Sequence, residues 1–188
     1  KSGQPVVVIA RPETRAAFAD RLGDQGCDYD VACAAGNLLM YDARESLSKF
    51  MRGSMVDEVR FNTEIGGIIA AGLHGRGPMT ARAYGEMVDV LFRDGNVAAA
   101  IRLEELWNGL SEKLSFELLC AYSINNFYTT GHAEQLKEIC RQHSHVLPTE
   151  TYSLLGNDQD RARKVIELQQ RERALQAEIE HRKAIELA

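Results

Sequence analysis

The sequence has no long hydrophobic run. No stretch of its 188 residues approaches the roughly 20 apolar positions that a transmembrane helix requires, and the N-terminus lacks a signal-peptide pattern. The composition, with 45% hydrophobic and 26% charged residues, is that of an ordinary globular protein in water. We therefore expect a cytoplasmic protein that has no membrane partner.

Clustered positive charge is missing as well. The formal net charge is −5, from 22 Lys and Arg against 27 Asp and Glu. A nucleic-acid surface needs gathered basic side chains that release counterions, so nucleic acid is not expected as a partner. The four cysteines form no CxxC pair and no dense disulfide pattern, and we expect them to be reduced and largely buried.

The common catalytic motifs are absent. No GxxxxGK[ST] phosphate loop and no GxSxG elbow occur, and no glycine-rich turn that could cradle phosphate follows an expected strand. We therefore assign no catalytic residue and expect that this chain is not itself an enzyme. The sequence identifies no cofactor.

One short segment carries residue types that bind metals. The segment "CRQHSHVLP" places Cys140, His143 and His145 near one another in the chain. A zinc site would need a further ligand in a suitable geometry. Histidines that face solvent or form hydrogen bonds are the favoured interpretation, and no metal site is predicted.

What the sequence does contain is an alternation of strands and helices. Apolar runs indicate strands at 5–10, 37–43, 79–87 and 116–123. The expected helices start at Pro12, Arg44, Asp57 and Asn96, and a further one covers 131–143. Parallel strands need crossovers of a dozen or more residues, which these segments supply. The predicted fold is α/β, a three-layer, mostly parallel sheet with helices on both faces.

Two of the helices have identifiable inner faces. In the helix after Asp57, three- and four-residue spacing predicts a buried stripe of Val59, Ile65, Ile68, Ile69 and Leu73. In the helix from Asn96, the spacing predicts a core face of Leu103, Leu106, Trp107 and Leu110. Two pairs on that helix, Arg102 with Glu105 and Glu104 with Asn108, are expected as surface neighbours.

The last 32 residues differ in composition from the rest. Residues 157–188 contain neither Gly nor Pro and predict one long C-terminal helix. Apolar residues at coiled-coil spacing indicate a seam of Val165, Leu168, Leu175 and Ile179, which Glu172 and Arg182 interrupt. We expect a parallel homodimer through 157–188 and a sensory domain over 1–156. A solvated helix that folds back on the domain is the alternative.

Polar residues follow each expected strand. In a parallel sheet, ligands gather beyond the carboxyl ends of the strands, where helix N-termini also point. The residues predicted to line a ligand site there are Arg11, Glu13, Asp42, Arg44, Glu86, Tyr122, Asn125 and Asn126. Their mixed charge suits a small polar or amphipathic molecule better than a polyanion.

Glu86 has two possible roles at its strand end. As a residue in the first turn of a helix it would be favoured there by the helix dipole, as a cap or structural residue. The alternative is contact with a ligand. We predict that Glu86 orients a neighbouring arginine or backbone amide and performs no chemistry, since acid–base catalysis needs a positioned partner.

The order of several segments resembles a known family. The segments "GQPVVVIARPETRAAFADRL", "GNLLMYDARESLSKFM", "RAYGEMVDVLFRDGNVAAAIRLEELWN", "FELLCAYSINNF" and "CRQHSHVLP" resemble the MEDS (methanogen/methylotroph sensory) domain over about residues 3–152. The resemblance implies a degenerate RecA/KaiC-like fold and a sensory module that responds to small organic compounds. It also implies fusion to histidine kinases or DNA-binding regulators.

The chain departs from the family pattern at its start. It begins without Met at "KSGQPVVVIA", just before a strand, and the family's usual first strand is absent, so we expect further residues upstream. The tail "LQAEIEHRKAIE" resembles a signalling helix, which favours a histidine kinase of a two-component system as the downstream module. The alternatives are a dimerisation or protein-interaction module on an ATPase-like scaffold, and a nucleotide-binding ATPase relative.

Overall fold

The computed structural model of the chain describes residues 3–123 and 138–146, together with the helical positions 163, 166, 167, 170, 171, 173, 175 and 179. The chain forms two compact units, Lys1–Gln142 and His143–Ala188. The predicted boundary after residue 156 remains a prediction. Asn125 and Asn126, which the sequence places near the ligand site, lie outside the described residues.

The first unit is built on a parallel sheet, as predicted. Its strands are β1 (Val6–Ala10), β2 (Leu38–Asp42), β5 (Ala81–Gly85) and β6 (Phe116–Cys120), in the order β2-β1-β5-β6. All three pairings are parallel, and the last residues of the strands lie nearly level, with Ala10 opposite Asp42 and Gly85 opposite Cys120. The residues that follow the strands therefore emerge at one edge.

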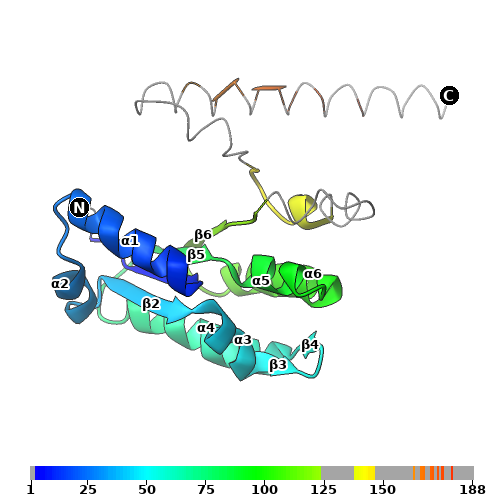
Figure 1. Ribbon diagram of the computed structural model, residues 1–188, viewed down its shortest axis with the longest axis horizontal. Coiled ribbons are helices and arrows are strands. Elements are labelled where there is room, and N and C mark those ends of the chain that lie inside the picture. Colours follow the sequence, from blue (N-terminus) through cyan, green and yellow to red (C-terminus); the bar gives the residue numbers. More distant parts are fainter. Residues whose placement is uncertain are drawn as a thin grey trace. The chain divides into compact units, whose positions relative to one another are not determined.

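Helices cover the sheet in two layers (Figure 1). α1 (Pro12–Asp24) and α2 (Tyr29–Ala34) pack on one face, through a small cluster around Val8, Ala10 and Leu38. The main core on the other face lies under α3 (Ala43–Phe50), α4 (Glu58–Leu73), α5 (Met87–Arg93) and α6 (Val97–Ser111). A short antiparallel hairpin, β3 (Met51–Arg52) and β4 (Met55–Val56), joins α3 to α4.

Short polar side chains fix where most of these helices begin. The side chains of Asp28, Asp42, Asp57 and Asn96 accept backbone N–H groups in the first turns of α2, α3, α4 and α6. In contrast, α1 has Pro12 at its first position and no capping bond from Arg11. The carboxylate that accepts a backbone N–H at the start of α1 belongs to Glu86, in a distant part of the sequence.

A row of aromatic rings organises the main core. The rings of Phe50, Phe61, Trp107 and Phe116 meet edge to face, with centroids 5.4, 5.4 and 5.7 Å apart along the row. The other three residues of the predicted core face of α6 are also buried, which confirms that prediction. Ile139, in the helical segment 138–141, is 1% exposed and joins this core.

Two predictions of burial are wrong. Val59 is 76% exposed, because it lies in the first turn of α4, and Phe61 takes the inner position there. Glu104 was expected on the surface, but it is only 2% exposed. In addition, the sequence did not predict α2, the β3–β4 hairpin or α5. The helix expected from Asn96 is confirmed as α6, and Gly95, whose φ is +76°, lies between it and α5.

Three further observations concern the cysteines, membrane spans and the C-terminal helix. The four cysteines are free thiols, although they are half-buried rather than fully buried. None of the helices in the described part of the chain is long and apolar enough to cross a membrane. The described positions from Arg163 to Ile179 are helical, and Leu175 and Ile179 of the predicted seam are exposed.

The contrast between two positions of α4 can be tested by unfolding in urea. Ile65→Ala empties a position that is fully buried, so we expect a loss of about 2–5 kcal/mol in the free energy of unfolding. Val59→Ala, on an exposed position of the same helix, should change it by less than about 0.5 kcal/mol. Equal losses in the two variants would contradict the placement of α4.

Candidate functional site

The polar residues after β1 and β5 meet at the edge of the sheet. The chain passes from β1 to β2 on one side, and β5 pairs with β1 on the other side. The strand order therefore reverses between β1 and β5, and the crevice at such a switch point is where α/β sheets bind ligands. Arg11 follows β1 and Glu86 follows β5, so both lie at this point.

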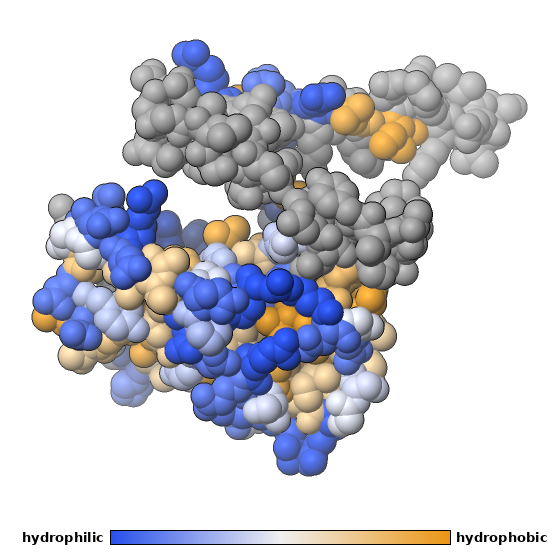
Figure 2. All heavy atoms as spheres, viewed as in Figure 1, coloured by the Kyte–Doolittle hydropathy of each residue, from blue (hydrophilic) through white to orange (hydrophobic). Residues whose placement is uncertain are grey.

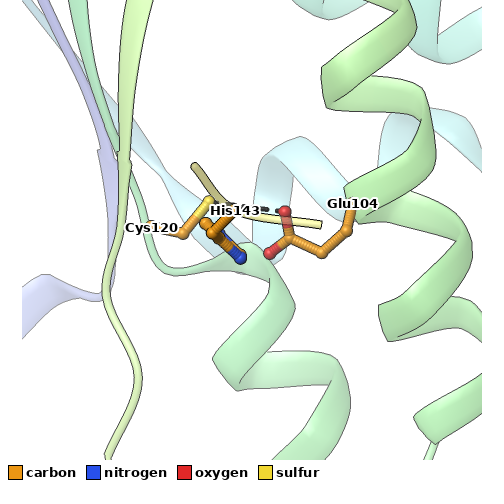
Figure 3. A group of neighbouring side chains, drawn as sticks. All are labelled: Glu104, Cys120 and His143. Atoms are coloured by element: carbon orange, nitrogen blue, oxygen red, sulfur yellow. Dashed lines mark hydrogen bonds between the residues drawn. The ribbon is translucent and has the colours of Figure 1, made fainter. Parts of the chain in front are cut away.

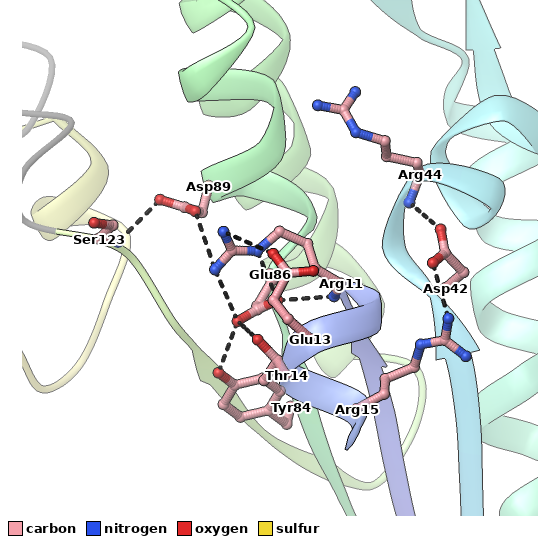
Figure 4. Close-up of polar contacts among 10 residues, drawn as sticks. All are labelled: Arg11, Glu13, Thr14, Arg15, Asp42, Arg44, Tyr84, Glu86, Asp89 and Ser123. Carbon is pink, nitrogen blue, oxygen red and sulfur yellow. Dashed lines mark hydrogen bonds and ion pairs between the residues drawn. The ribbon is translucent and has the colours of Figure 1, made fainter. Parts of the chain in front are cut away.

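The Glu86 carboxylate is the centre of the arrangement (Figure 4). It accepts hydrogen bonds from the backbone N–H of Arg11 at 2.8 Å and from the Arg11 guanidinium at 3.1 and 3.3 Å. The hydroxyls of Thr14 and Tyr84 donate to it at 2.9 and 3.2 Å. Glu86 is only 4% exposed. We call Arg11, Thr14, Tyr84, Glu86 and Asp89 the strand-end group.

These contacts bear on the structural role expected for Glu86, whereas contact with a ligand stays a prediction. It occupies the N-cap position of α5, but its side chain makes no capping bond there. Instead its carboxylate lies at the N-terminus of α1, where the helix dipole favours a negative charge. The prediction that it orients an arginine and a backbone amide is confirmed, whereas capping of its own helix is wrong.

Electrostatics keep Glu86 charged and its neighbour Tyr84 neutral. Burial raises the pKa of Glu86, but the hydrogen bonds from Arg11 and Thr14 outweigh burial and hold its pKa below the usual value. Burial and the nearby Glu86 charge raise the pKa of Tyr84. The Tyr84 hydroxyl therefore remains a donor at neutral pH, and its ring packs edge to face on Phe18 of α1.

A second set of charges lies beside this group, at the end of β2. Asp42 caps α3 and accepts a hydrogen bond from Arg15 at 3.0 Å. The backbone N–H groups of the α3 first turn and the Arg15 charge lower the pKa of Asp42. Arg44 turns to Asp94 instead, in a two-pronged pair with distances of 2.7 and 2.9 Å. Glu13 is 67% exposed, 3.6 Å from the Arg11 guanidinium.

Tyr122 belongs to a different group. Its hydroxyl donates to the buried carboxyl of Glu104 on α6, and the Cys120 thiol lies 3.7 Å from the same carboxyl (Figure 3). Burial raises the pKa of Glu104 to about 8. The structure thus brings together Arg11, Glu13 and Glu86, places Asp42 and Arg44 beside them, and gives Tyr122 a partner of its own.

Some of the described residues are of types that bind zinc. Glu104 and Cys120 carry zinc-ligand types, and so does His143, the first residue of the second unit. A structural zinc needs four ligands. His145 shares a hydrogen bond with the Ser144 hydroxyl at 3.1 Å, which is one of the states expected for it.

Sequence reasoning missed four residues around the site: Thr14, Arg15, Tyr84 and Asp89. Three of them could have been found from spacing. Thr14 and Arg15 follow Arg11 by three and four residues on a helix, and Asp89 follows Glu86 by three. Asp89 is 1% exposed and lies 3.9 Å from the Arg11 guanidinium.

The raised pKa of Glu104 predicts an unusual pH dependence. An unfolded glutamate titrates near 4.3, whereas Glu104 titrates at about 8 in the folded chain. Between these values the folded state keeps a proton that the unfolded state has lost, so stability falls as pH rises. Melting temperatures of Glu104→Gln should lack this decline and exceed the wild-type values near pH 8.

Glu105→Gln is the matched control for this measurement. Glu105 is the next residue on α6, and it is exposed and paired with Arg102 at 2.7 Å. Its variant should follow the wild-type pH profile. Parallel profiles for Glu104→Gln and wild type from pH 5 to 8.5 would show that Glu104 is not protonated in the folded chain.

Comparison with known proteins places the chain in a family. The family model of MEDS, the MEthanogen/methylotroph, DcmR Sensory domain, matches residues 1–144. No curated protein and no solved structure matches the chain. The RecA/KaiC-like topology that the resemblance implies therefore stays a prediction, beyond the parallel α/β sheet. Because the family model covers most of the sequence, the chain belongs to the MEDS family of sensory domains.

Proposed function

We propose that this chain is the input domain of a signal-transduction protein, which binds a small organic ligand at the carboxyl edge of its sheet. The C-terminal helix relays the signal to a histidine kinase of a two-component system, in the cytoplasm. The observation that carries the proposal is a group of buried and exposed charges at the switch point of a sensory-family fold. The chain itself is proposed to have no catalytic role.

The charged side chains at this edge differ in how far they are buried. The carboxylates of Glu86 and Asp89 are almost fully buried, and Arg11 spans them. Arg15 and Asp42 are 32% and 20% exposed, and Glu13 is largely exposed. Ligand sites commonly combine pre-formed surroundings with a few placed polar groups. Arg15, Asp42 and Glu13 are proposed as the groups that a polar ligand contacts first.

The same geometry disfavours a nucleotide. A phosphate loop offers several backbone N–H groups, but after β1 this chain has Arg11 and Pro12, and proline has no N–H. The position at the N-terminus of α1 where an anion would bind already holds the Glu86 carboxylate. A phosphate there would meet a buried negative charge, so an ATPase activity is not proposed.

The proposed relay requires the C-terminal helices of two chains to pair. Leu175 and Ile179 are 52% and 46% exposed in the single chain. They are four residues apart on the helix and would be covered if two chains formed the predicted coiled coil. We therefore propose a parallel homodimer through 157–188. A ligand can signal through it only if it binds one arrangement of the dimer more tightly than the other.

Ligand binding can be tested by thermal denaturation of the purified chain. The panel should contain short-chain carboxylates, alcohols and amines. At least one class should raise the melting temperature, because a ligand at 100 times its Kd stabilises the folded state by about 2.7 kcal/mol. Absence of any shift across the panel would count against a ligand sensor.

Two variants test whether a ligand that causes such a shift binds at the carboxyl edge. Arg15→Met removes a charge at the carboxyl edge and should abolish the shift. Arg82→Met removes an exposed arginine from β5 that pairs with Glu117, well before the carboxyl end of the strand, and should preserve the shift. If only Arg82→Met lost the shift, the ligand would bind at another surface and not at the carboxyl edge.

Dimerisation can be measured by sedimentation equilibrium. Ile179→Asp inserts a charge into the proposed seam and should convert the dimer to a monomer. Ile166→Asp is the matched control, since Ile166 is 55% exposed but lies about 180° around the helix from Leu175 of the seam. A wild-type chain that is monomeric at tens of micromolar would contradict the proposed dimer.

A further inference from the structure

The segment that leaves the sheet after β6 is tied to the site by side chains. The Ala121 N–H donates to Gly85 O at 2.9 Å and so continues the sheet pairing by one residue. The Tyr122 hydroxyl then contacts Glu104, and the Ser123 N–H donates to Asp89 Oδ1 at 2.9 Å. We call Ala121–Ser123 the exit segment, since these residues follow the last strand of the sheet.

Within the strand-end group, Asp89 is the residue that contacts the exit segment (Figure 4). One carboxylate oxygen accepts the Ser123 N–H, and the other lies 3.9 Å from the Arg11 guanidinium. Asp89 and Glu86 are one helical turn apart at the start of α5, so a single guanidinium faces both carboxylates. The contacts therefore run without a gap from Thr14 through Glu86, Arg11 and Asp89 to Ser123.

We propose that Arg11 and Asp89 couple the ligand site to the exit segment: a change in the position of the Arg11 guanidinium alters the hold of Asp89 on the Ser123 N–H. This inference rests on the proposed function, because it says how binding at the site reaches the output. Its physical basis is that a carboxylate with 1% exposure is oriented by the groups it contacts and not by water.

A ligand could use this coupling through Arg11. The guanidinium is 22% exposed, so a ligand can reach it. An anionic or hydrogen-bond-accepting group that draws the guanidinium outward would lengthen its contact with Asp89. The Ser123 N–H would then lose part of a charge-assisted hydrogen bond, which is about twice as strong as a neutral one.

The coupling can be measured without any ligand, by hydrogen exchange of individual amides in the full chain. Asp89→Asn should lower the protection of the Ser123 amide about fivefold, because a neutral acceptor replaces a charged one. Arg11→Lys keeps the charge but loses the planar fork, and should lower protection about threefold, although Arg11 does not contact Ser123. The double variant should match Asp89→Asn alone.

Two controls separate coupling from general loosening. Arg44→Lys alters a two-pronged arginine pair at the same edge, with Asp94, and should leave the Ser123 amide unchanged. The Ala121 amide, bonded to Gly85 O, should keep its protection in every variant. The proposal is overturned if Arg11→Lys leaves Ser123 unchanged, if Ala121 falls in parallel, or if the losses multiply in the double variant.

The outcome is independent of the ligand proposal. If the exchange result fails while a compound shifts the melting temperature, the site binds a ligand but its output takes another route. If the exchange result holds and no compound binds, the coupling exists without the proposed ligand. The two failures are thus told apart by experiments on the same chain.

Discussion

The ion pair between Arg11 and Glu86 is the interaction on which the carboxyl edge of the sheet depends. A carboxylate with 4% exposure is costly to bury unless its charge and lone pairs are satisfied. Here two hydroxyls, one backbone amide and one guanidinium satisfy it. These donors come from the end of β1, the start of α1 and the end of β5, so one side chain fixes how three elements meet.

This arrangement places a protein carboxylate where a sheet of this type often binds an anion. The N-terminus of a helix after the first strand is a natural place for an anion. In this chain the anion is part of the protein, and the arginine that accompanies it also faces Asp89. The negative charge that a nucleotide would supply is thereby built in, and in the proposed function the more exposed charges of Arg15, Asp42 and Glu13 contact a smaller molecule.

Much of the fold could be predicted from the sequence, and the failures have physical causes. The strands were predictable because parallel strands buried on both faces are continuous apolar runs, as in "VVVIA". Glu104 was misplaced because helical spacing describes one helix only, and the residues that cover it, Cys120 and Tyr122, arrive from β6 and beyond. Arg11, Glu13 and Glu86 were expected near one another because they follow strands, and they do meet. Their partners could not be predicted from the strand ends alone. Whether Glu86 would cap α5 or cross to α1 depended on which elements pack together, which no local pattern contains.

The pairing of Arg11 with Glu86 also has a consequence for how the chain is made. These residues are 75 positions apart in the sequence, and the pairing of β1 with β5 joins segments that are similarly far apart. Contacts of this separation make folding slow, since the entropy of a large loop is lost before they form. On the ribosome, β1 and β2 emerge before β5, so the edge between β1 and β5 stays unfinished until β5 has left the exit tunnel. The nascent chain therefore passes through a stage in which β1 and β2 are present but the carboxylate that Arg11 pairs with is not.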